Sequence, residues 1–237
     1  MNHCNYENQQ AYIQLGKNNV SATNQLKESS CVRFYNPHGA GKRILFVGNS
    51  MTLHGYRPEI GWYGRWGMAA SAPEKDYVHR LMAMVNEIAS DAAFGIAQVS
   101  QWESIYTNGR MVFPVYEEAR RFGADVIVMR FVENCPTANF EKEVFKTEMM
   151  ALLQYLNGTE NAKLILTTGF WRHPADETII EFAAEHALSL VELGDLGEMD
   201  EMKAIGLFAH QGVANHPGDM GMEEMAKRIF TALKTFL

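Results

Sequence analysis

Residues 43–52 read RILFVGNSMT, an apolar run that ends at a glycine and continues into small polar residues. Unbroken apolar runs of this length are typical of strands buried on both faces, as in parallel sheets. Ligands bind such sheets beyond the carboxyl ends of the strands. The polar residues after Gly48 therefore mark a candidate functional turn.

Comparable apolar runs recur along the chain and alternate with segments of helical spacing. Strands are predicted at 43–47, 95–100, 125–130, 162–168 and 188–193, and helices at 77–88, 144–156, 179–187 and 222–236. This alternation predicts one α/β domain of three layers, α/β/α, around a mostly parallel sheet of five strands. Residues 41–237 are assigned to this domain. Residues 1–40 are expected to be a partly ordered arm, because the first thirty residues show neither helical nor strand periodicity.

Composition and net charge indicate which kinds of partner the protein can have. The 237 residues are 47% hydrophobic and carry a formal net charge of −7, which argues against a nucleic-acid partner. No apolar run approaches the ~18 residues that cross a bilayer, so no membrane partner is expected. The polar N-terminus does not resemble a secretory signal, and a cytoplasmic location is the expectation.

The three cysteines, Cys4, Cys31 and Cys135, are scattered and form no CxxC pair. This predicts reduced thiols and neither a disulfide framework nor a zinc site. No His/Asp cluster with metal-ligand spacing is present, so no metal or other cofactor is expected. The oligomeric state is left open.

Ser50 follows the first predicted strand on a Gly-Asn-Ser turn. In this position its hydroxyl can point into the crevice while its own N–H faces an incoming carbonyl oxygen. A serine hydroxyl becomes nucleophilic when a base takes its proton. The alternative is an N-cap for the following segment.

His216 lies in a loop that runs into the last predicted helix. Pro217 restricts it to an extended backbone, which suits a fixed base. The alternative is a loop histidine bonded to backbone. An unperturbed imidazole here predicts activity that rises with pH between about 6 and 7. Asp219 is predicted to be the N-cap of the last helix, and His54 a residue at the rim of the site.

Three segments together resemble the SGNH (GDSL-like) hydrolase superfamily. Residues 44–52 look like its first sequence block, 130–134 like its third and 216–222 like its last, in the family's order. The resemblance covers residues 43–235 and implies a flavodoxin-like SGNH-hydrolase fold. It also implies a serine esterase of the acetylhydrolase type.

The resemblance assigns a role to each matching position. Ser50 would attack the acyl carbonyl, and His216 would take its proton and return it to the leaving alcohol. Asn134 would donate its side-chain amide to the oxyanion, together with the backbone N–H of Ser50. The family's second block supplies a glycine N–H, for which residues 99–102 offer only the N–H of Ser100.

Three other positions depart from the family pattern. Asn49 stands where most members have aspartate, and Val132 replaces the glycine of the third block. Val213 occupies the position of the usual acid, three residues before the histidine. Either a backbone carbonyl orients His216 in a Ser–His dyad, or a carboxylate such as Glu133 or Asp219 does so.

Residues 54–72 form an insertion with two tryptophans, two tyrosines and two arginines. Aromatic faces pack well on sugar rings, so a substrate-binding wall is one interpretation and a hydrophobic lid packed on the domain is the other. The wall would comprise Trp62, Trp66, Trp102 and Trp171. With the family resemblance, this favours a small-molecule or carbohydrate ester as substrate, such as an O-acetyl sugar.

Three other functions are alternatives to ester hydrolysis. The unusual second block and the absent aspartate are compatible with a non-catalytic sugar or ligand binder. An acyltransferase would use the same serine chemistry with a sugar hydroxyl as acceptor. A nucleotide binder is disfavoured, because the first loop lacks a glycine-rich phosphate cradle.

Overall fold

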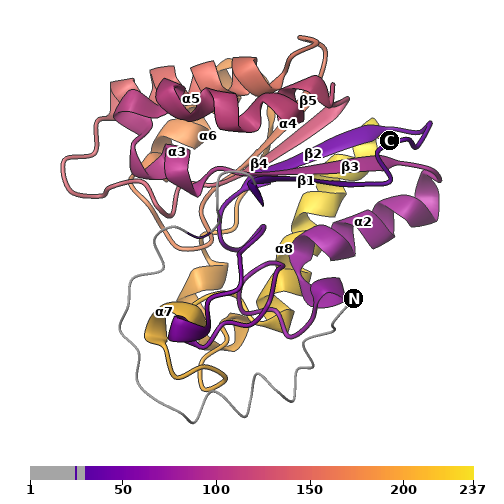
Figure 1. The fold of residues 1–237 in the computed structure, drawn as a ribbon. Coiled ribbons are helices and arrows are strands. Elements are labelled where there is room, and N and C mark those ends of the chain that lie inside the picture. Colours follow the sequence, from indigo (N-terminus) through magenta and orange to yellow (C-terminus); the bar gives the residue numbers. More distant parts are fainter. Residues whose placement is uncertain (1–24, 26–29) are drawn as a thin grey trace.

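The computed structural model describes residue 25 and residues 30–237. Residues 1–24 and 26–29 of the predicted arm, with Cys4, lie outside the described residues. A six-stranded sheet in the order β1-β3-β2-β4-β5-β6 forms the centre of the molecule (Figure 1). Its strands are β1 (Val32–Tyr35), β2 (Arg43–Gly48), β3 (Ala93–Gln98), β4 (Val126–Arg130), β5 (Lys163–Thr167) and β6 (Ser189–Val191).

The five predicted strands are β2 to β6, and all pair in parallel. Their order, β3-β2-β4-β5-β6, is the flavodoxin-like order, which confirms the predicted fold class. The strand count needs a correction, because β1 adds an antiparallel edge beside β3. This strand has only four residues, all half-buried, and lies in the stretch assigned to the arm. Its sequence signal is correspondingly weak.

Helices cover both faces of the sheet (Figure 1). The side chains of Ile44 and Phe46 join one core cluster, while those of Leu45 and Val47 join the other. Because both faces are buried, the β2 sequence is apolar without alternation. The first face carries α2 (Tyr77–Ile88) and α8 (Asp219–Leu233); the second carries α3 (Ser100–Ser104), α4 (Glu117–Arg121), α5 (Lys142–Leu156) and α6 (Ala175–Glu185).

The remaining elements of the described residues are short helical segments, which fall mostly outside the predicted elements. They are α7 (Gln211–Ala214) and the 3₁₀ segments η2 (Pro58–Ile60), η3 (Pro73–Lys75), η4 (Tyr106–Tyr116), η5 (Leu196–Glu198), η6 (Asp200–Met202) and η7 (Lys234–Phe236). Within the described part of the chain, no helix is long and apolar enough to cross a membrane.

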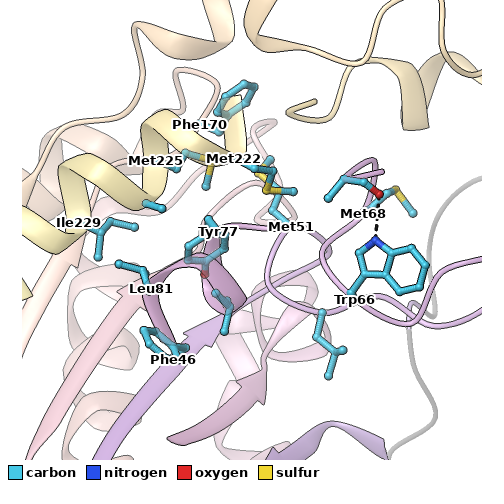
Figure 2. Close-up of a cluster of buried hydrophobic side chains, with 14 of the residues drawn as sticks. Phe46, Met51, Trp66, Met68, Tyr77, Leu81, Phe170, Met222, Met225 and Ile229 are labelled. Atoms are coloured by element: carbon cyan, nitrogen blue, oxygen red, sulfur yellow. Dashed lines mark hydrogen bonds between the residues drawn. The ribbon is translucent and has the colours of Figure 1, made fainter. Parts of the chain in front are cut away.

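Residues 54–72, here called the 54–72 loop, pack against the end of the sheet and against α8. Figure 2 shows Trp66 and Met68 of this loop beside Met51 and Met222. Backbone hydrogen bonds hold the loop to the turn after β2, with Met68 N–H donating to the Ser50 carbonyl at 2.8 Å. The loop is therefore a packed lid, the second of the two interpretations of its aromatic residues.

Candidate active site

The turn after β2 places Ser50 at the carboxyl end of the central strand, between β3 and β4. Strand order reverses at this position, which is where ligands bind in open α/β sheets. The turn folds back closely, with Thr52 N–H donating to the Asn49 carbonyl at 2.9 Å. A Cβ atom on Gly48 would lie 1.9 Å from Thr52 Oγ1, so this close return requires glycine.

Ser50 and His216, 166 residues apart in sequence, meet at this edge of the sheet. Ser50 Oγ lies 2.8 Å from His216 Nε2. His216 Nδ1 lies 2.5 Å from the Gly212 carbonyl oxygen. Because a carbonyl only accepts, Nδ1 carries the ring proton and the Nε2 lone pair faces the serine hydroxyl. A neutral imidazole in this tautomer can take the hydroxyl proton.

The group that orients His216 is thus a backbone carbonyl, one of the two alternatives left open by the sequence. Neither carboxylate candidate contacts the imidazole. Asp219 accepts hydrogen bonds from Ser71, from N–H at 2.8 Å and from Oγ at 2.6 Å. It is also not the N-cap of α8, since that position is Gly218. Glu133 is occupied by an ion pair with Arg130 at 2.6 Å.

Burial lowers the pKa of His216 to about 4, although the Gly212 carbonyl and the charge of Glu133 act in the opposite direction. The imidazole is therefore neutral at neutral pH. The rise in activity expected for an unperturbed histidine moves to about pH 4.

His54 is fully buried and does not lie at a rim as predicted. Its Nδ1 donates to the Gly55 carbonyl at 2.7 Å, and its ring packs edge-on against Trp62. Burial lowers the pKa of His54 to about 3. This histidine belongs to the packing of the 54–72 loop.

The three predicted oxyanion donors differ in how they are engaged. Among the described residues, no acceptor takes the backbone N–H of Ser50. The Asn134 amide donates one N–H to Glu103 Oε2 at 2.5 Å and accepts from Gln25 Nε2 at 3.1 Å, so its second N–H remains. Ser100 N–H faces Gln98 Oε1 at 3.3 Å and is engaged within its own segment. The geometry thus favours Ser50 and Asn134 as donors.

Asn134 belongs to a buried polar cluster that the sequence does not predict. It consists of Asn49, Glu103, Arg130, Glu133 and Asn134. The Asn49 amide donates to Glu103 Oε1 at 2.9 Å and to Glu133 Oε2 at 2.6 Å, and its carbonyl accepts from Arg130. Glu103 and Arg130 have no exposed surface. The only sequence signal for this cluster is a set of polar residues beside apolar strand ends.

The two carboxylates of the cluster differ in their charge environment. Burial and the neighbouring Glu133 raise the pKa of Glu103 to about 7. Burial also acts to raise the pKa of Glu133, but the Arg130 guanidinium holds it below its ordinary value. One arginine therefore stabilises one carboxylate, and Glu103 depends on N–H donors instead.

Of the four predicted substrate-binding tryptophans, only Trp171 adjoins the dyad. Its ring centroid lies 5.3 Å from that of His216, edge to face, and its side chain is half-buried. Trp62 and Trp102 have no exposed surface and pack in opposite core clusters. Trp66 is also buried, with its indole N–H donating to the Ala70 carbonyl at 2.9 Å. The prediction is wrong for these three, because their large apolar rings fill the core.

Within residues 25 and 30–237, no group of three or more His, Cys, Asp or Glu side chains is arranged to hold a metal ion. Cys135 is a buried free thiol, and Cys31 is also buried.

Comparisons with known proteins give matches of structure. No protein-family model and no curated protein matches the sequence. The fold resembles a lipase/acylhydrolase from Enterococcus faecalis, with a TM-score of 0.56, 17% identity and coverage of 82% of this chain and 96% of that one. It also resembles a psychrotrophic esterase from Pseudoalteromonas sp., with a TM-score of 0.56, 13% identity and coverage of 82% and 98%.

A third match is a two-domain esterase active on acetylated mannans, with a TM-score of 0.54 and 15% identity. The alignment covers 85% of this chain and 51% of that protein, so this chain spans about half of its length. At these identities the likeness establishes a shared fold.

Proposed function

We propose, from the SGNH-hydrolase fold that this chain shares with esterases, that it is a serine-dependent hydrolase of short-chain acyl esters. Its preferred substrates in this proposal are O-acetyl esters of carbohydrates. The observation that carries the proposal is the 2.8 Å hydrogen bond between Ser50 Oγ and His216 Nε2 at the carboxyl end of β2. A weakly nucleophilic hydroxyl and a neutral base already have the geometry that proton transfer requires.

In the first half of the reaction Ser50 Oγ attacks the acyl carbonyl carbon, and its proton passes to His216 Nε2. The resulting tetrahedral oxyanion accepts from the Ser50 N–H and the second N–H of Asn134. Its collapse breaks the ester bond, and His216 returns the proton to the leaving alcohol. Water then attacks the acyl-serine by the same route and releases the carboxylic acid and Ser50.

The dyad supports this cycle without a carboxylate at Nδ1. The Gly212 carbonyl fixes the tautomer and the ring orientation, which is the positioning part of the acid's usual role. Glu133 adds a nearby negative charge that favours the imidazolium formed during the reaction. Its Coulombic effect needs no hydrogen bond to the ring.

The carbohydrate part of the proposal rests on two observations. Trp171 is a half-buried aromatic side chain beside His216, and flat aromatic faces pack well on sugar rings. A protein of the same fold is an esterase active on acetylated mannans.

The test is hydrolysis of p-nitrophenyl acetate, butyrate and octanoate, together with acetate release from acetylated mannan. Wild type, Ser50→Ala and Ser104→Ala are compared, the last being an exposed serine that serves as the matched control. We expect acetate to be the best acyl group and only Ser50→Ala to fall to the background rate. Acetyl transfer to a sugar without acetate release would indicate an acyltransferase, and inactivity on every ester would favour a ligand-binding protein.

A further inference from the structure

Glu103, on the short helix α3, extends its buried carboxylate toward the turn that carries Asn134. Its Oε2 accepts the Asn134 amide N–H at 2.5 Å. Its Oε1 accepts the backbone N–H of Val132 at 2.5 Å and the Asn49 amide at 2.9 Å. The Glu103 carboxylate thus accepts three N–H groups, two from the turn of Asn134 and one from the turn of Ser50.

The orientation of the Asn134 amide follows from this contact. A side-chain amide can be turned over by half a rotation, which exchanges its donor and acceptor ends. A carboxylate accepts only, so Glu103 requires the NH₂ end on its side, and Gln25 Nε2 donates to the other end. The second N–H of the NH₂ group is then left for a substrate oxygen.

The backbone of the same turn also depends on Glu103. Val132 has φ = 121°, a conformation that favours glycine and is costly for a β-branched residue. The turn is closed by Cys135 N–H, which donates to the Val132 carbonyl at 2.8 Å. The hydrogen bond from Val132 N–H to Glu103 stabilises this strained backbone directly before Asn134.

The third donor connects Glu103 to the nucleophile. Asn49 immediately precedes Ser50, and its amide is held by the carboxylate that holds Asn134. Removal of this carboxylate would therefore loosen both turns with respect to each other. A shift of about 1 Å in catalytic groups is enough to reduce rates by about a hundredfold.

We propose that Glu103 is a positioning residue for ester hydrolysis, which fixes the Asn134 amide toward the oxyanion and joins its turn to that of Ser50. This inference rests on the proposed function. Glu103 touches no reacting atom, so its effect passes through the two side chains that it holds. Asn134 carries most of this effect, because the Asn49 amide also donates to Glu133.

The charged and titratable groups that face Glu103 are Glu133, Arg130 and the Cys135 thiol. Burial and Glu133 raise the pKa of Glu103 to about 7. Protonation converts one acceptor oxygen into a donor, and the carboxyl can then no longer accept from all three N–H groups. Activity should therefore decline as pH falls through about 7, well above the loss from protonated His216 at about pH 4.

A double-mutant cycle tests whether Glu103 acts through Asn134. We expect Glu103→Gln to lower kcat about 10- to 100-fold with little change in KM, and Asn134→Ala about 100- to 1,000-fold. In the Asn134→Ala background, Glu103→Gln should cost less than about threefold. Glu133→Gln is the matched control, because this neighbouring carboxylate does not touch Asn134 and its effect should be additive.

Two further readouts separate positioning from structural support. The activity step near pH 7 should be absent from Glu103→Gln, while the loss near pH 4 remains. In wild type, the Asn134 side-chain amide resonance, identified by its absence from Asn134→Ala, should titrate with the same midpoint. The NMR readout stays informative even where Glu103→Gln does not fold.

Additive effects in the cycle, or an Asn134 resonance that does not move with pH in active wild-type enzyme, would overturn the role of Glu103. A wild type without Ser50-dependent turnover would contradict the proposed function itself. The two failures are therefore distinguishable.

Discussion

At the scale of single residues, Asn49 shows why this site departs from the pattern it resembles. Two carboxylates, Glu103 and Glu133, share the cluster with one cation, Arg130. The Asn49 amide donates to both carboxylates while its carbonyl accepts from Arg130. An aspartate could not donate to either carboxylate and would add a third negative charge.

Asn49→Asp is therefore expected to lower the free energy of unfolding by about 3 kcal/mol at about pH 8, because it buries a charge without a partner of its own. The loss should shrink toward about pH 5, where a carboxyl of the cluster takes up a proton. Urea denaturation at both pH values measures it. Asn161→Asp, at an exposed asparagine, should change the free energy by less than about 0.5 kcal/mol. Equal losses in both variants would contradict this account.

Individual residues differ in how far their position could be predicted. Ser50 and His216 follow simple local rules, since one ends a strand and the other precedes a proline and a helix. The fold brings them to 2.8 Å. Glu103 has no such local signal, because its three partners come from turns far away in the sequence. A buried charge is recognised only when its partners are known.

At the scale of elements, the 54–72 loop is joined to α8 through Asp219. This carboxylate accepts both the N–H and the Oγ of Ser71 at the first turn of the helix. Gly67 N–H is held in turn by Asp76, the N-cap of α2, at 2.9 Å. Two helix N-termini therefore anchor the loop that covers the turn after β2.

Asp219→Ala should raise the hydrogen-exchange rate of the Ser71 amide at least about tenfold, because the amide loses its acceptor and a hydrogen bond to a charged group contributes about 1.5–3 kcal/mol. Hydrogen exchange followed by mass spectrometry resolves this segment. Glu224→Ala, which removes a partly exposed ion pair on the same helix, is the control. Unchanged exchange at residues 67–72 in Asp219→Ala would contradict the anchoring role.

The elements also show which sequence signals were sufficient. The parallel strands and long helices were predictable, because their apolar patterns are continuous and of the right length. Strand β1 and segment η4 were not, since a short edge strand and a 3₁₀ segment have weak periodicity. Composition alone does not separate a ring that lines a site from one packed in the core, so the sequence leaves both interpretations of the tryptophans in the 54–72 loop open.

At the scale of the whole molecule, two buried histidines link stability to pH. Burial lowers the pKa of His54 to about 3 and that of His216 to about 4, whereas both groups take up protons near 6.5 once unfolded. Unfolding below pH 6.5 therefore binds protons, and the free energy of unfolding falls as the pH decreases. Glu103, with its raised pKa, acts in the opposite direction between about 7 and 4.5.

His54→Asn isolates one of these contributions, since an asparagine amide can still donate to the Gly55 carbonyl and does not titrate. Between about pH 6 and 4, the free energy of unfolding of the variant should fall by about 1.4 kcal/mol less per pH unit than that of wild type. Denaturation curves at several pH values give the slopes. His38→Asn, at an exposed histidine, is the control for the substitution itself. A His54→Asn slope equal to that of wild type would show that His54 does not stay neutral in the fold.

The central claim is that Ser50, activated by His216, is a covalent nucleophile, and reaction with a fluorophosphonate tests it most directly. Intact-protein mass spectrometry should show one adduct in wild type and Ser104→Ala, located by peptide mapping on the peptide that contains Ser50. Ser50→Ala should form no adduct, and His216→Ala should react at least about a hundredfold more slowly. An unlabelled wild type, or an adduct that persists in Ser50→Ala, would contradict the account.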